Sequence, residues 1–177
     1  VPQALGFAEF LCSLPVDAVL VQDMGLFSLL RERAPGLPLH CSTQMSLHTP
    51  AGVRLLHGLG ASRVVLAREL SLPEIEEIAG ACPVELESFV HGALCMSVSG
   101  QCYCSALLGG RSGNRGMCAQ PCRLPFSAPG GTGHDLSLKD LSFITEVRRL
   151  EKAGASSAKK DCRMKHPQND PPTLAPY

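Results

Sequence analysis

Short apolar runs alternate with segments of helical periodicity along most of the chain. Runs typical of buried strands cover residues 17–21, 37–41, 63–67, 84–90, 135–139 and 156–160. Segments with apolar residues at helical spacing, several of them opened by a cap, cover residues 3–14, 25–33, 50–59, 71–79 and 142–153. This alternation, with short connections, predicts an α/β fold whose parallel sheet is joined by crossover helices.

Polar residues follow nearly every expected strand, at Gln22–Asp23, Ser42–Gln44, Arg68–Glu69, His91 and Lys139–Asp140. In a (β/α) barrel these positions line the face that carries the chemistry, so we favour a TIM-like barrel over an open doubly wound sheet. About five or six strands are visible, and the chain begins at Val1, so we expect a partial barrel that is a fragment. We assign residues 1–165 to this barrel, residues 87–125 to a cysteine-rich loop module within it, and the polar, proline-rich residues 166–177 to a disordered or aberrant tail.

Composition narrows the class of protein without identifying it. The 177 residues carry a formal net charge of zero, and 45% of them are hydrophobic, which predicts an ordinary globular domain. A neutral chain has no overall field that would attract nucleic acid, so RNA binding would need a local basic patch. The sequence has neither a membrane-length apolar run nor a signal pattern, and we expect a cytoplasmic protein with no membrane partner.

Nine cysteines are present, and five of them are concentrated in the loop module. The spacings Cys95-x6-Cys102 and Cys118-x3-Cys122 place four thiols in glycine- and serine-rich sequence that can fold around an inorganic core. A 4Fe-4S cluster is favoured over zinc, while disulfides and inert buried thiols remain alternatives. Cys104 is a spare thiol, and the cysteines expected to be small core hydrophobes are Cys12, Cys41 and Cys82.

Three arginines of the same module, Arg111, Arg115 and Arg123, form the local basic patch. Together with the neighbouring glycines they suit a phosphate or carboxylate, although a solvated turn is the alternative. Possible catalytic groups at the barrel mouth are Glu69, His91 and Lys139, each of which could instead be structural. Glu85 and Glu87 share one strand face, as either substrate or pairing groups. The zinc-protease, nucleophile-elbow and phosphate-loop motifs are absent from the sequence.

The sequence Glu87-Ser-Phe-Val-His-Gly-Ala-Leu-Cys95, followed by Ser99-Gly-x-Cys102 and Arg111-Ser-x-Asn-Arg-Gly-x-Cys118-Ala-Gln-Pro-Cys122-Arg, resembles the U-32 peptidase family, also called collagenase-like proteases. Weaker likeness extends over roughly residues 15–165. The resemblance implies a barrel-like domain with a cysteine-held 4Fe-4S cluster. By position, the ligands would be Cys95, Cys102 and Cys118, with Cys122 as the fourth. Some relatives carry a cysteine where this chain has Ser142.

The same resemblance implies an iron-sulfur enzyme that hydroxylates a base of tRNA or ribosomal RNA, as some members of the family do. Other members take part in oxygen-independent hydroxylation of quinones, and the older family name implies a peptidase acting on protein. An inactive fragment is a further alternative. The chain departs from the family at Lys159–Lys165, where the family usually has Lys-Ile-Glu-Gly-Arg-Met-Lys.

Overall fold

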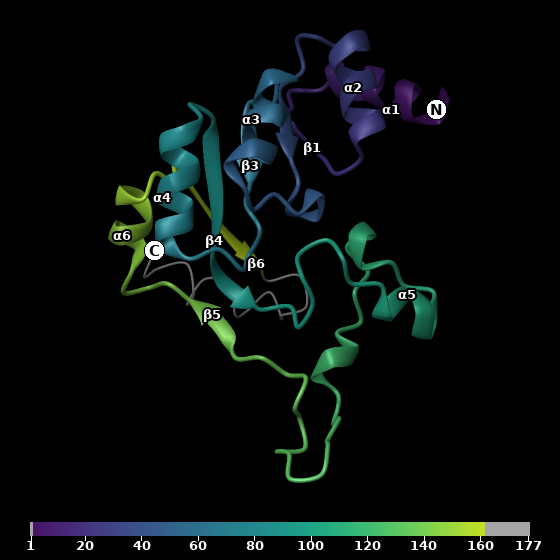
Figure 1. The fold of residues 1–177 in the computed structure, drawn as a ribbon. Helices are drawn as coiled ribbons and strands as arrows, with labels where there is room; N and C mark the ends of the chain where they lie inside the picture. Colours follow the sequence, from purple (N-terminus) through teal and green to yellow (C-terminus); the bar gives the residue numbers. More distant parts are fainter. Residues whose placement is uncertain (1, 162–177) are drawn as a thin grey trace.

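The computed structural model describes residues 2–161, which form one six-stranded sheet with its connecting helices (Figure 1). The strands are β1 (Val19–Val21), β2 (Leu39–Cys41), β3 (Arg63–Val65), β4 (Glu85–Ala93), β5 (Asp140–Ser142) and β6 (Ser157–Asp161). The α-helices are α1 (Pro2–Cys12), α2 (Met24–Arg33), α3 (Pro50–Gly58), α4 (Leu72–Ala81), α5 (Cys104–Gly109) and α6 (Val147–Lys152). Three short 3-10 turns are η1 (Thr43–Met45), η2 (Gly113–Arg115) and η3 (Pro121–Arg123).

Strands β1 to β4 lie side by side in sequence order, and each pairs with the next in parallel. Strand β6 adds to β4 in parallel as well. The α/β fold with a parallel sheet, predicted from the alternation, is therefore confirmed. The partial barrel stays a prediction, because the strands described here form an open sheet with β1 at one edge.

The strand expected at residues 135–139 is wrong in place and in direction. Strand β5 begins at Asp140 and pairs antiparallel with the end of β4, which a rhythm of crossover helices does not produce. Asp135 instead closes a turn, where its carboxylate accepts hydrogen bonds from the backbone N–H groups of Ala128 at 2.9 Å and Thr132 at 2.7 Å. These bonds hold the pKa of the Asp135 carboxyl below its usual value.

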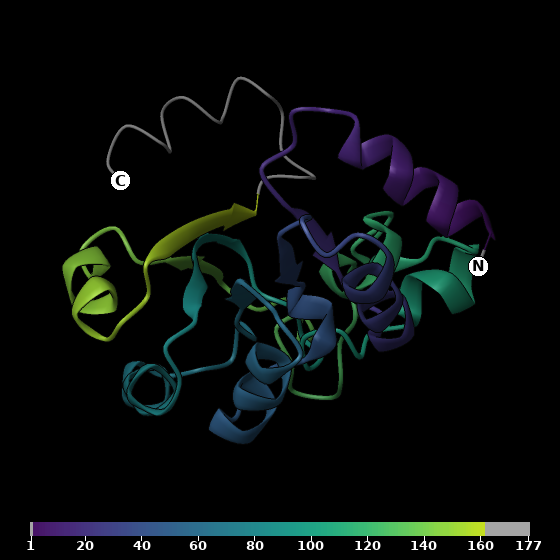
Figure 2. The same ribbon diagram turned by 90° about the horizontal axis from the view of Figure 1, so that it is seen from above.

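The core lies between one face of the sheet and a row of helices. Figure 2 shows α3, α4 and α6 along one side of the strands. Their buried side chains pack against inward-facing strand residues, among them Val64 and Leu86, in a single hydrophobic cluster. Helix α4 begins where the sequence predicts, since the backbone N–H of Ser71 donates to Glu74 Oε2 at 2.7 Å in a capping box.

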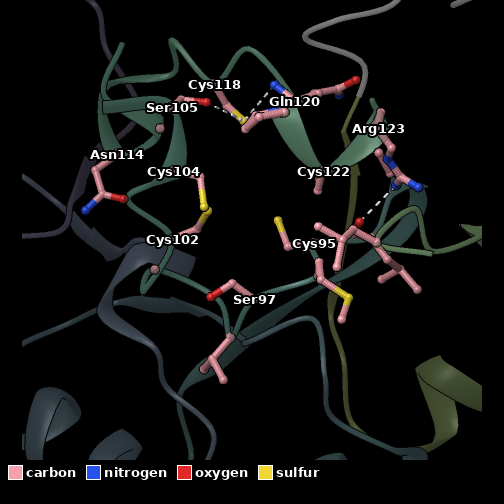
Figure 3. Close-up of a pocket in the computed structure, with 18 of the residues that line it drawn as sticks. Cys95, Ser97, Cys102, Cys104, Ser105, Asn114, Cys118, Gln120, Cys122 and Arg123 are labelled. Atoms are coloured by element: carbon pink, nitrogen blue, oxygen red, sulfur yellow. Dashed lines mark hydrogen bonds between the residues drawn. The ribbon is translucent and has the colours of Figure 1, made fainter. Parts of the chain in front are cut away.

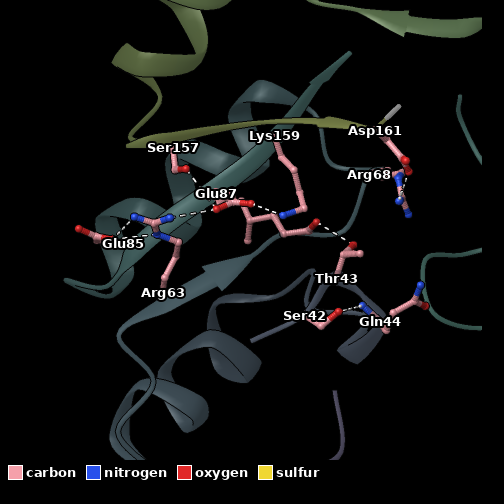
Figure 4. Close-up of polar contacts among 11 residues, drawn as sticks. Ser42, Thr43, Gln44, Arg63, Arg68, Glu85, Glu87, Ser157, Lys159 and Asp161 are labelled. Atoms are coloured by element: carbon pink, nitrogen blue, oxygen red, sulfur yellow. Dashed lines mark hydrogen bonds and ion pairs between the residues drawn. The ribbon is translucent and has the colours of Figure 1, made fainter. Parts of the chain in front are cut away.

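The opposite face of the sheet carries charged side chains (Figure 4). Glu87 is 6% exposed, and its carboxylate pairs with Lys159 Nζ at 2.6 Å and with Arg63 Nη1 at 3.2 Å. The hydroxyl of Ser157 donates to the same carboxylate at 3.1 Å. Burial alone would raise the pKa of Glu87, but these partners together lower it. The arrangement agrees with the interpretation of Glu85 and Glu87 as pairing groups, since Glu85 also pairs with Arg63 at 2.9 Å.

Within residues 2–161, none of the helices has the length and apolar character that a membrane crossing requires. The expected tail at residues 166–177 and residues 162–165 of the departure from the family lie outside the described residues. Cys41 and Cys82 are buried, as expected of small core residues. Cys12 is exposed, so its assignment to the core is wrong: helix α1 has a weakly segregated apolar pattern and buries only Ala8.

Candidate functional site

A cavity of about 410 Å³ lies beyond the end of β4, within the cysteine-rich segment. Its walls include the side chains of Cys95, Cys102, Cys104, Cys118 and Cys122. Figure 3 shows these five cysteines arranged around a common space. The four cysteines that the sequence singled out are therefore brought together, and the spare thiol Cys104 joins them.

Each cysteine reaches the cavity from a different piece of the loop. Cys95 lies two residues beyond the end of β4 at Ala93, and Cys104 is the first residue of the short helix α5. Cys122 lies in the 3-10 turn η3, which proline opens at its first position. Because these short pieces turn sharply, thiols far apart along the loop can converge on one space.

A set of hydrogen bonds to Ser99 ties the loop to the end of β3. Ser99 is fully buried, and its hydroxyl accepts from the backbone N–H of Arg68 at 3.1 Å. Its own N–H donates to the carboxylate of Glu69. The next residue, Gly100, has a positive φ of 81° and packs so closely on the Gln44 carbonyl that a Cβ would collide with it. The loop is thus fixed against the sheet on the side that holds the cysteines.

The sulfur of Cys118 is a hydrogen-bond acceptor in this structure. It receives the backbone N–H of Gln120 at 3.3 Å and the hydroxyl of Ser105 at 3.7 Å. The Ser105 hydroxyl in turn accepts from the N–H of Ala119 at 3.0 Å. These bonds fix the position of the sulfur and aim two donors at it.

Burial and neighbouring thiols raise the pKa values of Cys95 and Cys104. Burial raises the pKa of Cys95 most strongly, and the neighbouring Cys118, Cys102 and Cys122 raise it further, while the guanidinium of Arg68 lowers it. The pKa of Cys104 is raised chiefly by the adjacent Cys102 thiol. Thiols gathered at one cavity are electrostatically suited to a shared cationic centre, because such a centre would relieve the repulsion between thiolates.

The geometry of the thiols bears on the kind of centre. In the part of the chain described here, no three His, Cys, Asp or Glu side chains stand close enough around one point to hold a single metal ion. The cysteines are instead spread around a larger space. The eight cysteines from Cys12 to Cys122 are all free thiols, so none of the described cysteines is used in a disulfide.

The three predicted substrate arginines differ in their surroundings. Arg123 lines the cavity, and its guanidinium donates to the backbone carbonyls of Leu94, at 2.9 Å, and Leu138, and to Ser137 Oγ at 2.9 Å. These bonds tie three segments of the loop together. Arg111 and Arg115 are exposed, although Arg111 Nε donates to the Met117 carbonyl at 3.0 Å. Two of the three side chains are therefore available at the surface of the loop.

The three predicted catalytic groups lie outside the described cavity wall. Glu69 anchors Ser99, as described above. His91 lies within β4, where it is paired in register with Ser142 of β5. Lys139 is exposed on the segment just before β5. Their catalytic roles stay predictions.

Two charged residues of the cavity wall were not among the site residues selected from the sequence. Arg68 follows β3 and Asp161 ends β6, and both line the cavity, where Arg68 Nη2 pairs with Asp161 Oδ2 at 3.0 Å. Arg68 had the signal of a polar residue after a strand. No sequence pattern marked Asp161 as a cavity residue, because its contact with Arg68 depends on how β6 returns to the sheet.

Comparison with known proteins gives a consistent set of relatives. The model of peptidase family U32 matches residues 1–174. A 23S rRNA 5-hydroxycytidine synthase of Escherichia coli is 42% identical over 157 residues, covering 85% of this chain and 24% of the relative. The tRNA hydroxylation protein P of the same organism is 43% identical over 121 residues, covering 68% of this chain and 27% of the relative. A collagenase of Porphyromonas gingivalis is 32% identical over 173 residues, covering 86% of this chain and 41% of the relative. The chain thus spans less than half the length of each of these curated relatives.

Proposed function

This chain belongs to peptidase family U32, and from that membership we propose that it is the cysteine-bearing part of an iron-sulfur enzyme that hydroxylates a base of tRNA or ribosomal RNA. The observation that carries the proposal is the convergence of Cys95, Cys102, Cys118 and Cys122 on one cavity. The names of the relatives that act on RNA support the choice of reaction.

The donor set at the cavity fits a 4Fe-4S cluster better than a single ion. Four cysteine thiolates are the usual ligands of such a cluster, which is wider than one metal ion and needs its thiols spread accordingly. The hydrogen bonds from Gln120 and Ser105 to the sulfur of Cys118 are of the kind that stabilise a ligating thiolate. When bound, the cluster would supply redox chemistry that protein side chains lack.

The remaining residues of the site would bind and position the substrate. Arg111 and Arg115, exposed on the loop, provide the positive charge with which RNA phosphates would pair. Arg123 would act indirectly, by holding the loop closed around the cysteines through its bonds to Leu94, Ser137 and Leu138. His91, Glu69 and Lys139 stay in the proposal as groups at the same end of the sheet. We also propose that this sheet is part of a (β/α) barrel in the cytoplasm, with the cysteine loop at its mouth.

The cluster is tested by metal analysis of the 177-residue protein purified without oxygen. We expect iron and sulfide together with brown colour in the unmodified protein, and loss of most of both in Cys102→Ser. Cys12→Ser is the matched control, because Cys12 is exposed on α1 and outside the cavity. Iron-free protein after anaerobic reconstitution, or equal iron in the two variants, would contradict the proposed centre.

Hydroxylation turns a C–H bond of the base into C–OH, so it needs an oxygen donor that also accepts two electrons. The reaction is therefore tested by incubating the reconstituted protein with tRNA or with ribosomal RNA and with a cell extract that supplies small-molecule oxygen donors, and by analysing the nucleosides by mass spectrometry. Gain of one oxygen atom on a base, lost in Cys102→Ser, is the expected result. A peptidase is the alternative that the name of the collagenase relative favours. It predicts instead that gelatin is cleaved and that cleavage survives removal of iron.

A further inference from the structure

Arg68 is a buried cation in the wall of the cysteine cavity, and no step of the proposed function uses it. Its side chain is 5% exposed, and it lines the same cavity as the five cysteines. A guanidinium does not lose its proton in a protein, so this positive charge is permanent. Buried charges are costly and are retained where paired or where they serve a centre of opposite charge.

Three contacts fix the position of Arg68. Its Nη2 pairs with Asp161 Oδ2 at 3.0 Å, and its guanidinium lies 4.0 Å from the centre of the Phe89 ring (Figure 4 shows the pair with Asp161). Its backbone N–H donates to Ser99 Oγ at 3.1 Å, on the loop that also carries Cys95 and Cys102. Arg68 is thereby held between the sheet and the cysteine loop.

One hydrogen-bond donor of Arg68 has no acceptor within residues 2–161. Its Nε is buried and has no hydrogen-bond partner among the described residues. A buried N–H without an acceptor destabilises the fold, and such groups in a native site call for another reason to be retained.

The charges around the cavity favour an interaction between Arg68 and the sulfur centre. The charged residues lining the cavity are Arg68, Arg123 and Asp161, so cations outnumber carboxylates among the described residues. Arg123 is occupied by the backbone carbonyls of Leu94 and Leu138, and its charge is paired with the carboxylate of Asp140 at 3.5 Å. The side chain of Arg68 is 5% exposed and that of Arg123 is 20% exposed, so the charge of Arg68 is the less screened by water of the two.

We propose that Arg68 tunes the reduction potential of the cluster that the cavity cysteines hold. Its fixed positive charge raises that potential. This inference rests on the proposed function, since it requires the cluster. One-electron reduction, by dithionite in the test below, adds one negative charge to the centre and neither makes nor breaks a bond to Arg68. A buried cation nearby stabilises that added charge, because screening is weak away from water.

The test compares Arg68→Gln, Arg68→Lys and Arg115→Gln with the unmodified 177-residue protein, all reconstituted without oxygen and titrated with dithionite under electron paramagnetic resonance. We expect equal iron content, and a fall of roughly tenfold in the equilibrium constant for reduction in Arg68→Gln, which for one electron corresponds to about 59 mV. Arg68→Lys keeps the charge and should retain most of the potential. Arg115→Gln removes an exposed arginine of the same loop and should leave the potential unchanged.

The outcomes separate this inference from the proposed function. Iron bound at an unchanged potential in Arg68→Gln would overturn the inference alone. Loss of iron from both Arg68→Gln and Arg68→Lys would also overturn it, because the role would then be to hold the loop through the planar guanidinium. Absence of iron from the unmodified protein would overturn the proposed function together with this inference.

Discussion

Replacement of Glu87 by glutamine tests the charged network on the sheet face that lies opposite the helices. Glutamine keeps the shape of the side chain and one acceptor oxygen, but removes the charge that Lys159 and Arg63 share. The carboxylate of Glu87 is 8% exposed in its side chain, so water cannot replace the lost partner. We therefore expect Glu87→Gln to lower the free energy of unfolding at neutral pH.

The magnitude follows from the contacts. A hydrogen bond to a charged group contributes about 1.5–3 kcal/mol. Glutamine removes the charge from the contacts with Lys159, Arg63 and Ser157, although its amide oxygen can still accept a hydrogen bond. Two facts reduce the cost: the side chain of Lys159 is 32% exposed, and Arg63 keeps its bond to Glu85. We expect a loss of about 2–4 kcal/mol, which overlaps the lower part of the roughly 3–5 kcal/mol range for breaking a buried ion pair and extends below it.

The assay is urea unfolding followed by circular dichroism, with Glu85→Gln as the matched control. Glu85 pairs with the same Arg63 but its side chain is 56% exposed, so its replacement should cost less than about 1 kcal/mol. The folded-state pKa of Glu87 is lowered, so its stabilising charge is present above the unfolded-state value and is lost as pH falls through the folded value. The difference between Glu87→Gln and the unmodified protein should therefore shrink as the pH falls below the ordinary Glu pKa of about 4.3 and through the lowered pKa of Glu87. Equal losses for the two variants, or a difference independent of pH, would refute the reasoning.

Three further predictions concern the core, the loop and the thiols. Leu86→Ala, at a core position 1% exposed, should cost about 2–5 kcal/mol in urea unfolding, whereas Leu107→Ala, at a position 83% exposed, should be nearly neutral; similar costs would argue against the described core. Gly100→Ala should weaken the attachment of the cysteine loop, because a Cβ collides with the Gln44 carbonyl and φ is positive; faster proteolysis within the loop checks this, and an unchanged rate contradicts it. Cys41, whose pKa burial raises to about 12, should resist iodoacetamide at neutral pH in the folded protein while Cys12 reacts, and peptide mass spectrometry would reveal the reverse order.

The elements that the sequence predicted well are those encoded by neighbouring residues. The capping box at Ser71 and Glu74 fixes the start of α4 through a bond within one turn of helix. Apolar runs bounded by polar residues mark β1 to β4 because the face of each strand that packs against the helices needs apolar side chains. The clustering of cysteines in one loop indicated that their thiols lie near one another, as the cavity has them, while the inorganic centre stays a prediction.

Contacts between distant parts of the chain were decided only by the tertiary structure. Strand β5 runs antiparallel because its segment returns to the end of β4, a choice that local periodicity does not record. Arg68 and Asp161 are 93 residues apart, and only the docking of β6 beside β4 brings them together. The occupation of Arg123 by loop carbonyls also follows from the path of the loop. Local hydrogen bonds and periodicity are determined by residues that are close in the sequence. The partners of a buried charge depend instead on which distant segments the fold brings beside it.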